Sequence, residues 1–193
     1  MAHLIYIANT SLDGYTEDRE GNFDWTTPTE EGFRLVTNLV RATGTHIYGR
    51  RMYQSMMLWE TDPTLAAESP LRREFAEIWQ AADKIVYSRT LAAVATRRTR
   101  IERTFDPEAI RQLKAAVEHD VLIGGPELTA HAFRSGLIDE CHLFIAPILL
   151  GGGKPALPDN VRLELELVAE RRFENGIVYV GYRTTNDAPT TDS

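Results

Sequence analysis

Three short segments of the sequence place glycine, arginine or serine directly after an apolar run. They are Gly49-Arg50-Arg51, Ser88-Arg89-Thr90 and Gly124-Gly125-Pro126-Glu127. Glycine lets a phosphate approach backbone amides, a helix N-terminus adds roughly half a positive charge, and arginine can bind a phosphate through two parallel hydrogen bonds. Each segment alone is also typical of an ordinary turn with a solvated arginine. Because all three follow predicted strands, we expect them to meet at one edge of a sheet and bind a phosphate-bearing ligand.

Glu30 is the first acidic candidate for orienting a substrate or relaying a proton. It ends the segment Trp25-Thr26-Thr27-Pro28-Thr29-Glu30. Thr27-x-x-Glu30 matches a capping box, with Thr27 as the N-cap of a helix that begins at Pro28. Glu30 also lies three residues before Phe33, on the helix side that we expect to face the core, where a carboxylate could bind a polar heterocycle. The sequence is compatible with capping and with ligand contact.

Asp13 is the second acidic candidate, within Leu12-Asp13-Gly14-Tyr15. An Asp-Gly pair is also typical of an ordinary turn, and the turn is the favoured interpretation. Residues 11–31 form a long predicted loop, and loops of this length often act as lids or binding elements. We therefore expect this loop to border the substrate.

Other site chemistries find no support in the sequence. Gly-x-Gly-x-x-Gly and Gly-x-Ser-x-Gly are absent, and the five histidines lack the spacing of metal ligands, so we predict no metal site. The segment 151–155, GGGKP, lacks the first glycine and the hydroxyl residue of a phosphate loop, and we interpret it as a flexible turn beside the site. Cys141 and His142 are neighbours on a predicted strand and point to opposite faces, which favours a buried cysteine over a thiol dyad.

Alternating strands and helices must position these residues. Apolar runs predict strands at residues 3–8, 45–48, 84–88, 100–104, 121–123, 141–147, 163–173 and 177–184. Helical spacing predicts helices that begin at Pro28, Pro70, Pro107 and Pro126, and Asn175-Gly176 predicts a hairpin between the last two strands. This order indicates an α/β fold with a mostly parallel sheet, helices on both faces and a C-terminal antiparallel hairpin.

The composition is that of an ordinary globular domain. The chain has 193 residues, is 43% hydrophobic and 25% charged, and carries a formal net charge of −7, which gives no support to nucleic-acid binding. Its one cysteine excludes an internal disulfide and is typical of a reducing compartment. No apolar run approaches the ~20 residues that span a membrane, and residues 1–11 predict a strand instead of a signal peptide. We predict a cytoplasmic protein with a single domain at 1–184 and a polar tail at 185–193.

The sequence resembles the dihydrofolate reductase superfamily over nearly its whole length. In that superfamily a Trp-x-x-Pro-x-acid segment opens a helix, and Trp25 to Glu30 match it, with Glu30 at the substrate-binding acid position. The segment 49–52, GRRM, matches Gly-Arg-x-Thr except at its last residue, and Ser88-Arg89 and the segment 123–125, IGG, match two further turns. Segments 11–15, 124–128, 136–140 and 147–155 resemble the reductase domain of riboflavin biosynthesis and its single-domain relatives.

The resemblance implies a three-layer α/β/α sandwich and an NADPH-dependent reductase of a pteridine- or aminouracil-like heterocycle. It implies cofactor contacts at Ala8, Thr10, Gly49, Arg50, Arg51, Ser88, Arg89, Gly124, Gly125, Pro126, Glu127 and Leu128. It assigns substrate contacts to Trp25, Glu30 and Phe33, and catalytic roles to Glu30 and Asp13. The most similar activity is reduction of 5-amino-6-(5-phosphoribosylamino)uracil. The alternatives are a dihydrofolate reductase-type activity, a non-catalytic NADP-binding protein and a flavin or quinone reductase. The resemblance is also compatible with a homodimer.

Overall fold

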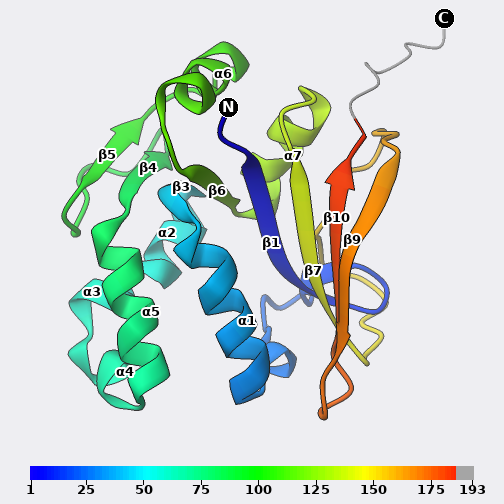
Figure 1. Cartoon of the computed structure of the whole chain (residues 1–193). Helices are drawn as coiled ribbons and strands as arrows, with labels where there is room; N and C mark the ends of the chain where they lie inside the picture. The colour runs from blue at the N-terminus through cyan, green and yellow to red at the C-terminus, as the bar shows by residue number, and fades with distance from the viewer. Residues whose placement is uncertain (186–193) are drawn as a thin grey trace, which may run out of the picture.

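The computed structural model of the chain describes residues 1–185, and an eight-stranded sheet forms its centre (Figure 1). The strand order is β5-β4-β3-β6-β1-β7-β10-β9. Strands from β5 to β7 are parallel, whereas β10 pairs antiparallel with β7 and β9. The bounds are β1 Leu4–Ser11, β3 Thr43–Gly49, β4 Asp83–Tyr87, β5 Thr99–Glu102, β6 Asp120–Gly124, β7 Glu140–Ala146, β9 Leu165–Arg172 and β10 Val178–Thr184. The predicted parallel sheet with a C-terminal hairpin is confirmed.

Helices cover both faces of the parallel part of the sheet. One layer contains α1 Glu30–Arg41, α2 Arg50–Met56, α3 Leu58–Thr61, α4 Pro63–Ala67 and α5 Pro70–Ala81, and the other contains α6 Pro107–Ala116 and α7 Pro126–Arg134. Side chains alternate between the two layers along each strand. Ile47 packs with the α6 and α7 cluster, and its neighbour Tyr48 packs with α2 and α5. The three-layer sandwich is thereby confirmed.

The start of α1 differs from the sequence prediction. Thr27 is not its N-cap, because the Thr27 hydroxyl donates to the carbonyl of Asp24 at 3.0 Å and closes a short 3-10 helix, Asp24–Thr26. The N-cap is Thr29, whose hydroxyl accepts from the amide of Gly32 at 3.0 Å. The predicted capping box between Thr27 and Glu30 is therefore wrong. The starts of α5 and α6, capped by Ser69 and Asp106, are confirmed.

Two parts of the structure were absent from the sequence prediction. Residues 50–67 form the short helices α2, α3 and α4. The predicted loop at 11–31 contains β2, Tyr15–Glu17, which pairs with β8, Lys154–Pro155, in a separate two-stranded sheet. Among the described residues, no helix combines the length and the apolar character needed to cross a membrane. The predicted polar tail lies outside the described residues except for Thr185.

Candidate functional site

Two of the predicted turns lie side by side at the carboxyl edge of the sheet. Gly49 ends β3 and Gly124 ends the neighbouring strand β6, and because Tyr48 pairs with Gly124, Gly125 lies beside Gly49. A Cβ placed on Gly125 would lie 3.6 Å from the amide nitrogen of Gly49 and 3.5 Å from the Cβ of Met52. Gly125 also has φ +97°, a backbone conformation that favours glycine. The two helix starts, α2 and α7, therefore lie close together at a turn whose backbone conformation favours glycine.

The N-termini of α2 and α7 differ from those of four other helices. A side chain caps each of α1, α4, α5 and α6, through Thr29, Asp62, Ser69 and Asp106. By contrast, α2 and α7 begin after Gly49 and Gly125, and neither has a side-chain cap. The first backbone amides of a helix lack partners within it, and their positive end favours an anion. Two uncapped helix starts together are suited to bind a phosphate or pyrophosphate group.

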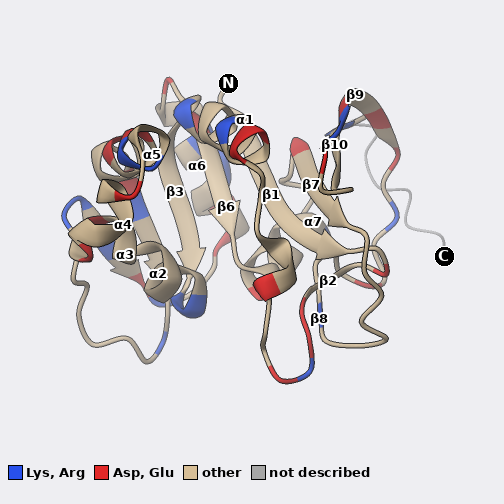
Figure 2. Cartoon of the chain, turned by 90° about the horizontal axis from the view of Figure 1, so that it is seen from below, with Lys and Arg blue, Asp and Glu red and all other residues tan. Residues whose placement is uncertain are grey.

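Arginines surround this pair of helix starts, as the blue ribbon at the start of α2 shows (Figure 2). Arg50 donates to the Thr90 hydroxyl at 2.9 Å and links the β3 turn to the β4 turn. Arg51 is 80% exposed and lies 3.8 Å from Glu17, and Arg89 is exposed without an ion pair to any described residue. The Ser88 hydroxyl accepts from the amides of Thr90 and Leu91, so it fixes its own turn. Thus the three predicted turns converge.

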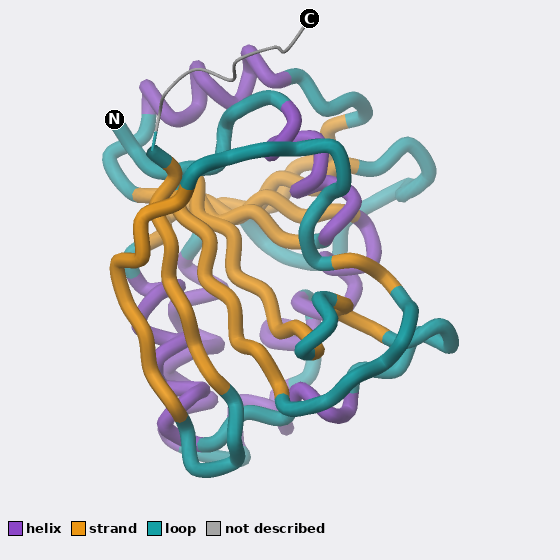
Figure 3. Tube along the Cα trace, turned by 90° about the vertical axis from the view of Figure 1, so that its right-hand side faces the viewer, coloured by secondary structure: helices purple, strands orange, loops and turns teal. Residues whose placement is uncertain are grey.

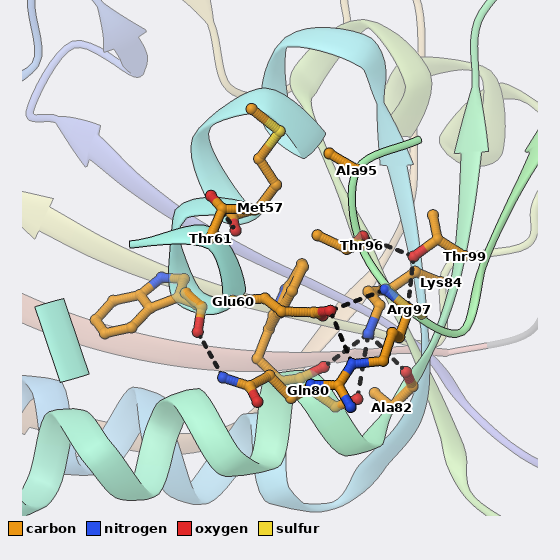
Figure 4. Close-up of polar contacts among 12 residues, drawn as sticks. Met57, Glu60, Thr61, Gln80, Ala82, Lys84, Ala95, Thr96, Arg97 and Thr99 are labelled. Atoms are coloured by element: carbon orange, nitrogen blue, oxygen red, sulfur yellow. Dashed lines mark hydrogen bonds and ion pairs between the residues drawn. The ribbon is translucent and has the colours of Figure 1, made fainter. Parts of the chain in front are cut away.

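The segment after Ser88-Arg89-Thr90 is anchored to α3 (Figure 4). Glu60 accepts from the amide of Arg97 at 2.9 Å through a side chain that is only 10% exposed. Nearby, the buried Lys84 ammonium donates to the carbonyls of Ala82 and Trp79 at 2.9 and 3.1 Å, and burial lowers its pKa. These bonds tie the end of α5 to β4. The bond from Arg97 to Glu60 holds the segment that follows the Ser88-Arg89-Thr90 turn against α3.

The sheet opens between β1 and β6 beside the glycine turn. β1 pairs with β6 only from Leu4 to Tyr6, but it pairs with β7 from Ile5 to Ser11. Successive residues of a strand direct their backbone groups to opposite sides, and the carbonyl of Leu4 is directed towards β7, where it accepts from Asp139. By this alternation, Asn9 directs its amide and carbonyl towards the side that β6 has left. Asn9 is also exposed, although it lies on a central strand. Ala8 and Thr10 flank Asn9 and were predicted to contact the cofactor, and both have buried side chains.

An open groove of about 1180 Å³ extends from the start of α7 along β2 and β8. Lys154 lies in it with a side chain that is 19% exposed, 3.1 Å from Glu127 and 3.4 Å from Glu17. The Glu127 side chain is therefore directed towards Lys154. Its contribution to the start of α7 is its backbone amide and not its carboxylate. Lys154 was not singled out from the sequence, because residues 151–155 were interpreted as a flexible turn. Its ion-pair partners, Glu17 and Glu127, are also distant in the sequence.

Trp25 and Phe33 lie in different clusters. Trp25 packs in the cluster of Phe144 and Phe173, and its buried indole nitrogen has no hydrogen-bond partner among the described residues. Phe33 packs against Trp59 and Phe75, with ring centroids 6.0 and 5.3 Å away. A buried N–H donor without a partner is rare and often marks a place where another group binds. Trp25 is thus better supported than Phe33 as a substrate contact.

The structure corrects the expected orientation of Glu30. Its side chain is 80% exposed and pairs with Arg34 at 2.9 Å, instead of facing the core. Because α1 begins at Glu30 and not at Pro28, the residue occupies the first helical position and points to solvent. The structure therefore places the Glu30 carboxylate in an exposed ion pair with Arg34 on α1.

We expect Glu30→Gln to retain near-native turnover and melting temperature. An exposed helical ion pair of this kind contributes ~0.3–0.5 kcal/mol, and glutamine preserves the shape of the side chain. Steady-state kinetics, with the compound that the wild-type protein is found to reduce, would measure kcat and KM of the variant. Gln112→Glu, an exposed change on α6, serves as a matched control for altered surface charge. A loss of more than about tenfold in kcat/KM for Glu30→Gln alone would restore the substrate role implied by the resemblance.

Asp13 binds the glycine-rich segment that follows β7. Its carboxylate accepts from the amides of Leu150 at 3.1 Å and Gly151 at 2.7 Å and from the Ser11 hydroxyl at 2.7 Å. These hydrogen bonds, led by that from Ser11, lower the pKa of Asp13 to about 2. A carboxylate with this pKa stays ionised at neutral pH, so Asp13 is suited to hold the segment in place and not to donate a proton.

The sequence was compared with models of known protein families. The family model of the RibD C-terminal domain matches residues 2–179. The chain belongs to this family. Reductase chemistry is characteristic of the family, and membership of the family agrees with the resemblance to the riboflavin-biosynthesis reductase domain.

Individual relatives show how far the likeness extends. The uncharacterized protein YyaP of Bacillus subtilis is 30% identical over 182 residues, covering 93% of both chains. The riboflavin biosynthesis protein RibD of Mycobacterium tuberculosis is 31% identical over 169 residues, which are 82% of this chain and 46% of that protein. The chain thus spans about half the length of RibD.

Solved structures share the fold at lower sequence identity. A candidate riboflavin biosynthesis protein from Shewanella sp. PV-4 has a TM-score of 0.74 at 22% identity, covering 96% of this chain and 99% of that one. A deaminase and 5-amino-6-(5-phosphoribosylamino)uracil reductase from Thermotoga maritima has a TM-score of 0.64 at 16% identity, covering 95% and 57%. These likenesses show the dihydrofolate reductase-like fold.

Proposed function

We propose that the protein is an NADPH-dependent reductase of an aminouracil-like heterocycle, most like 5-amino-6-(5-phosphoribosylamino)uracil. The observation that carries the proposal is the pair of uncapped helix starts at Gly49 and Gly125, adjacent to each other and surrounded by arginines. A dinucleotide pyrophosphate has the charge and size that this arrangement favours. Membership of a reductase family supports the assignment.

The residues of this edge fit NADPH, which would supply the hydride. The amides of Arg50, Arg51, Glu127 and Leu128 are available at the two helix starts, whereas Pro126 has no amide hydrogen. The opening beside Asn9 is the place that fits a nicotinamide amide group, because backbone groups there lack a strand partner. The chain itself therefore binds and orients the cofactor.

The substrate side of the proposed site lies between the opening at Asn9 and Trp25. Trp25 offers an aromatic ring and an unpaired buried N–H donor, both suited to a polar heterocycle. Neither Glu30 nor Asp13 is arranged as a proton donor, since one carboxylate is in solvent and the other accepts three hydrogen bonds. We infer that neither carboxylate takes part in the proton transfer and that water supplies the proton to the reduced substrate.

We expect NADPH to bind at least about tenfold more tightly than NADH. A charge-assisted hydrogen bond contributes ~1.5–3 kcal/mol, and Arg50 and Arg89 are the cations available to a 2′-phosphate. Isothermal titration calorimetry would measure both affinities. Arg89→Gln should reduce the preference several-fold, whereas Arg111→Gln should not, because Arg111 pairs with Glu108 on α6. Equal affinities of the wild-type protein for the two cofactors would contradict this assignment.

NADPH oxidation in the presence of candidate substrates tests the proposed function directly. We expect turnover with 5-amino-6-(5-phosphoribosylamino)uracil and much weaker turnover with dihydrofolate. Turnover with dihydrofolate alone would establish the dihydrofolate reductase-type alternative. Cofactor binding without turnover of either compound would favour a non-catalytic NADP-binding protein.

A further inference from the structure

Arg103 follows the end of β5 and lies beside the turn that ends β4, residues 88–91, which we call the β4 turn. The two strands are parallel neighbours, and the amide of Ser88 donates to the carbonyl of Glu102 at 2.9 Å. One nitrogen of the Arg103 guanidinium, Nη1, donates to the carbonyl of Ser88 at 2.9 Å and to that of Leu91 at 2.8 Å. Arg103 therefore connects the first and the last residue of the β4 turn.

Other hydrogen bonds hold the β4 turn from within and from α2. The Ser88 hydroxyl accepts from the amides of Thr90 at 3.3 Å and Leu91 at 3.0 Å, and the Thr90 hydroxyl accepts from Arg50 at 2.9 Å. Arg89 differs from its neighbours, because its side chain is exposed and its guanidinium has no hydrogen bond or ion pair to any residue within 1–185. The fixed turn thus presents the cation of Arg89 at the carboxyl edge of the sheet.

We propose that Arg103 is a positioning residue that makes the site specific for NADPH over NADH. This role rests on the proposed function, in which Arg89 is one of the cations available to a 2′-phosphate. The two cofactors differ only at that phosphate, so a residue that fixes Arg89 changes the affinity for NADPH and not that for NADH. Two charge-assisted hydrogen bonds hold the turn before any cofactor binds, which lowers the cost of ordering it on binding.

Arg103 acts through the backbone of the β4 turn. Each terminal nitrogen of a guanidinium carries two N–H donors, and the carbonyls of Ser88 and Leu91 use both donors of Nη1. Without Arg103, these carbonyls lose their partner, and the conformation that presents Arg89 is no longer fixed from the side of β5. The effect of Arg103 on cofactor binding therefore depends on Arg89.

Isothermal titration calorimetry of the full chain with NADPH and with NADH tests this role. We expect Arg103→Met to raise the dissociation constant for NADPH by about fivefold or more and that for NADH by less than about twofold. Arg103→Lys should recover part of the loss, because an ammonium group can donate to both carbonyls.

The matched control is Arg172→Met, which removes an exposed arginine from β9. β9 and β5 form opposite edges of the sheet, and the edge of β9 is on the side that faces the viewer in Figure 3. Arg172→Met should leave both affinities unchanged. Circular dichroism would verify that the variants are folded, and Arg103→Gln replaces Arg103→Met if the latter is not.

The double variant Arg89→Gln with Arg103→Met separates positioning from direct contact with the phosphate. If Arg103 acts through Arg89, the added Arg103→Met change should weaken NADPH binding by no more than about twofold beyond Arg89→Gln alone. Additive losses would overturn the positioning role. In the free protein, hydrogen exchange should be faster at the amides of Thr90 and Leu91 in Arg103→Met, and this measurement needs no cofactor.

The outcomes distinguish the role of Arg103 from the proposed function. NADPH binding by the wild-type protein with a preference that Arg103→Met leaves unchanged would overturn the role of Arg103 and leave the reductase assignment standing. Equal losses of affinity for NADPH and NADH would also overturn it, because Arg103 would then have a structural role alone. A folded wild-type protein that binds neither cofactor would contradict the proposed function, and the role of Arg103 with it.

Discussion

Gly125→Ala is expected to weaken NADPH binding by about 10- to 150-fold. The residue has φ +97°, and an added Cβ would lie 3.5 Å from Met52 and 3.6 Å from the amide of Gly49. These distances are ordinary van der Waals contacts, but a residue with a side chain is strained at φ +97°. The backbone would therefore shift, and the two helix starts that meet here would lose their common orientation towards an anion. One charge-assisted hydrogen bond contributes ~1.5–3 kcal/mol, which corresponds to the stated loss in affinity. Isothermal titration calorimetry on the folded protein would measure it.

Gly136→Ala is the matched control for the backbone cost. Gly136 has φ +63° at the other end of α7, and an added Cβ would have nothing within 4 Å. Both substitutions force a residue with a side chain into a positive φ, which costs ~1–2 kcal/mol of stability. Only the change at Gly125 should also reduce cofactor affinity. If both variants lose stability and both bind NADPH like the wild-type protein, the glycine turn has a structural role alone.

The parts of the fold that were predicted correctly depend on local signals. Ser69 and Asp106 each precede a proline and an apolar helical pattern, and both cap the helices that follow. Gly176 has φ +84° in the hairpin that Asn175-Gly176 predicted. The edge at which the three turns meet also followed from the sequence, since parallel strands direct their carboxyl ends to the same side.

The missed parts depend on contacts between distant residues or on competition between similar local signals. Helices of 4 to 7 residues, such as α2 and α3, are too short for an apolar period to be recognised. Thr27 and Thr29 are both suitable caps, but in the structure the Thr27 hydroxyl bonds to Asp24, whereas the Thr29 hydroxyl accepts from Gly32 and caps α1. That shift of the helix start also moves Glu30 from the core side to solvent.

The pairing of β2 with β8 shows the same limit at the site. Thr16 donates to the carbonyl of Lys154 across 138 positions of sequence, and Asp13 binds Leu150 and Gly151 at a similar separation. No local pattern signals such contacts. The segment of three glycines therefore suggested a flexible turn, although it packs closely against the chain after β2. Its glycines differ in what surrounds them, which makes them separable by mutation.

Gly153→Ala is expected to separate β2 from β8 and lower the melting temperature by roughly 4–20 °C. An added Cβ would lie 2.0 Å from the carbonyl oxygen of Glu17 and 3.0 Å from the Cα of Asp18, and φ is +143°. Overpacking costs ~1–3 kcal/mol and a positive φ adds ~1–2 kcal/mol, which gives this range for a chain of this size. Hydrogen exchange should show faster exchange of the amides in β2. The groove beside the start of α7 should change as well, because Lys154 and Glu17 would lose their positions in it.

Gly151→Ala provides the control within the same segment. Gly151 has φ +66°, but an added Cβ there would meet nothing within 4 Å, and its amide could still donate to Asp13. The variant should therefore show only the backbone cost of ~1–2 kcal/mol, with β2 amides protected as in the wild-type protein. If Gly151→Ala and Gly153→Ala lower stability equally and change the β2 amides alike, backbone conformation alone explains the glycines. If only Gly153→Ala opens β2, close packing against Glu17 is the reason that this position requires glycine.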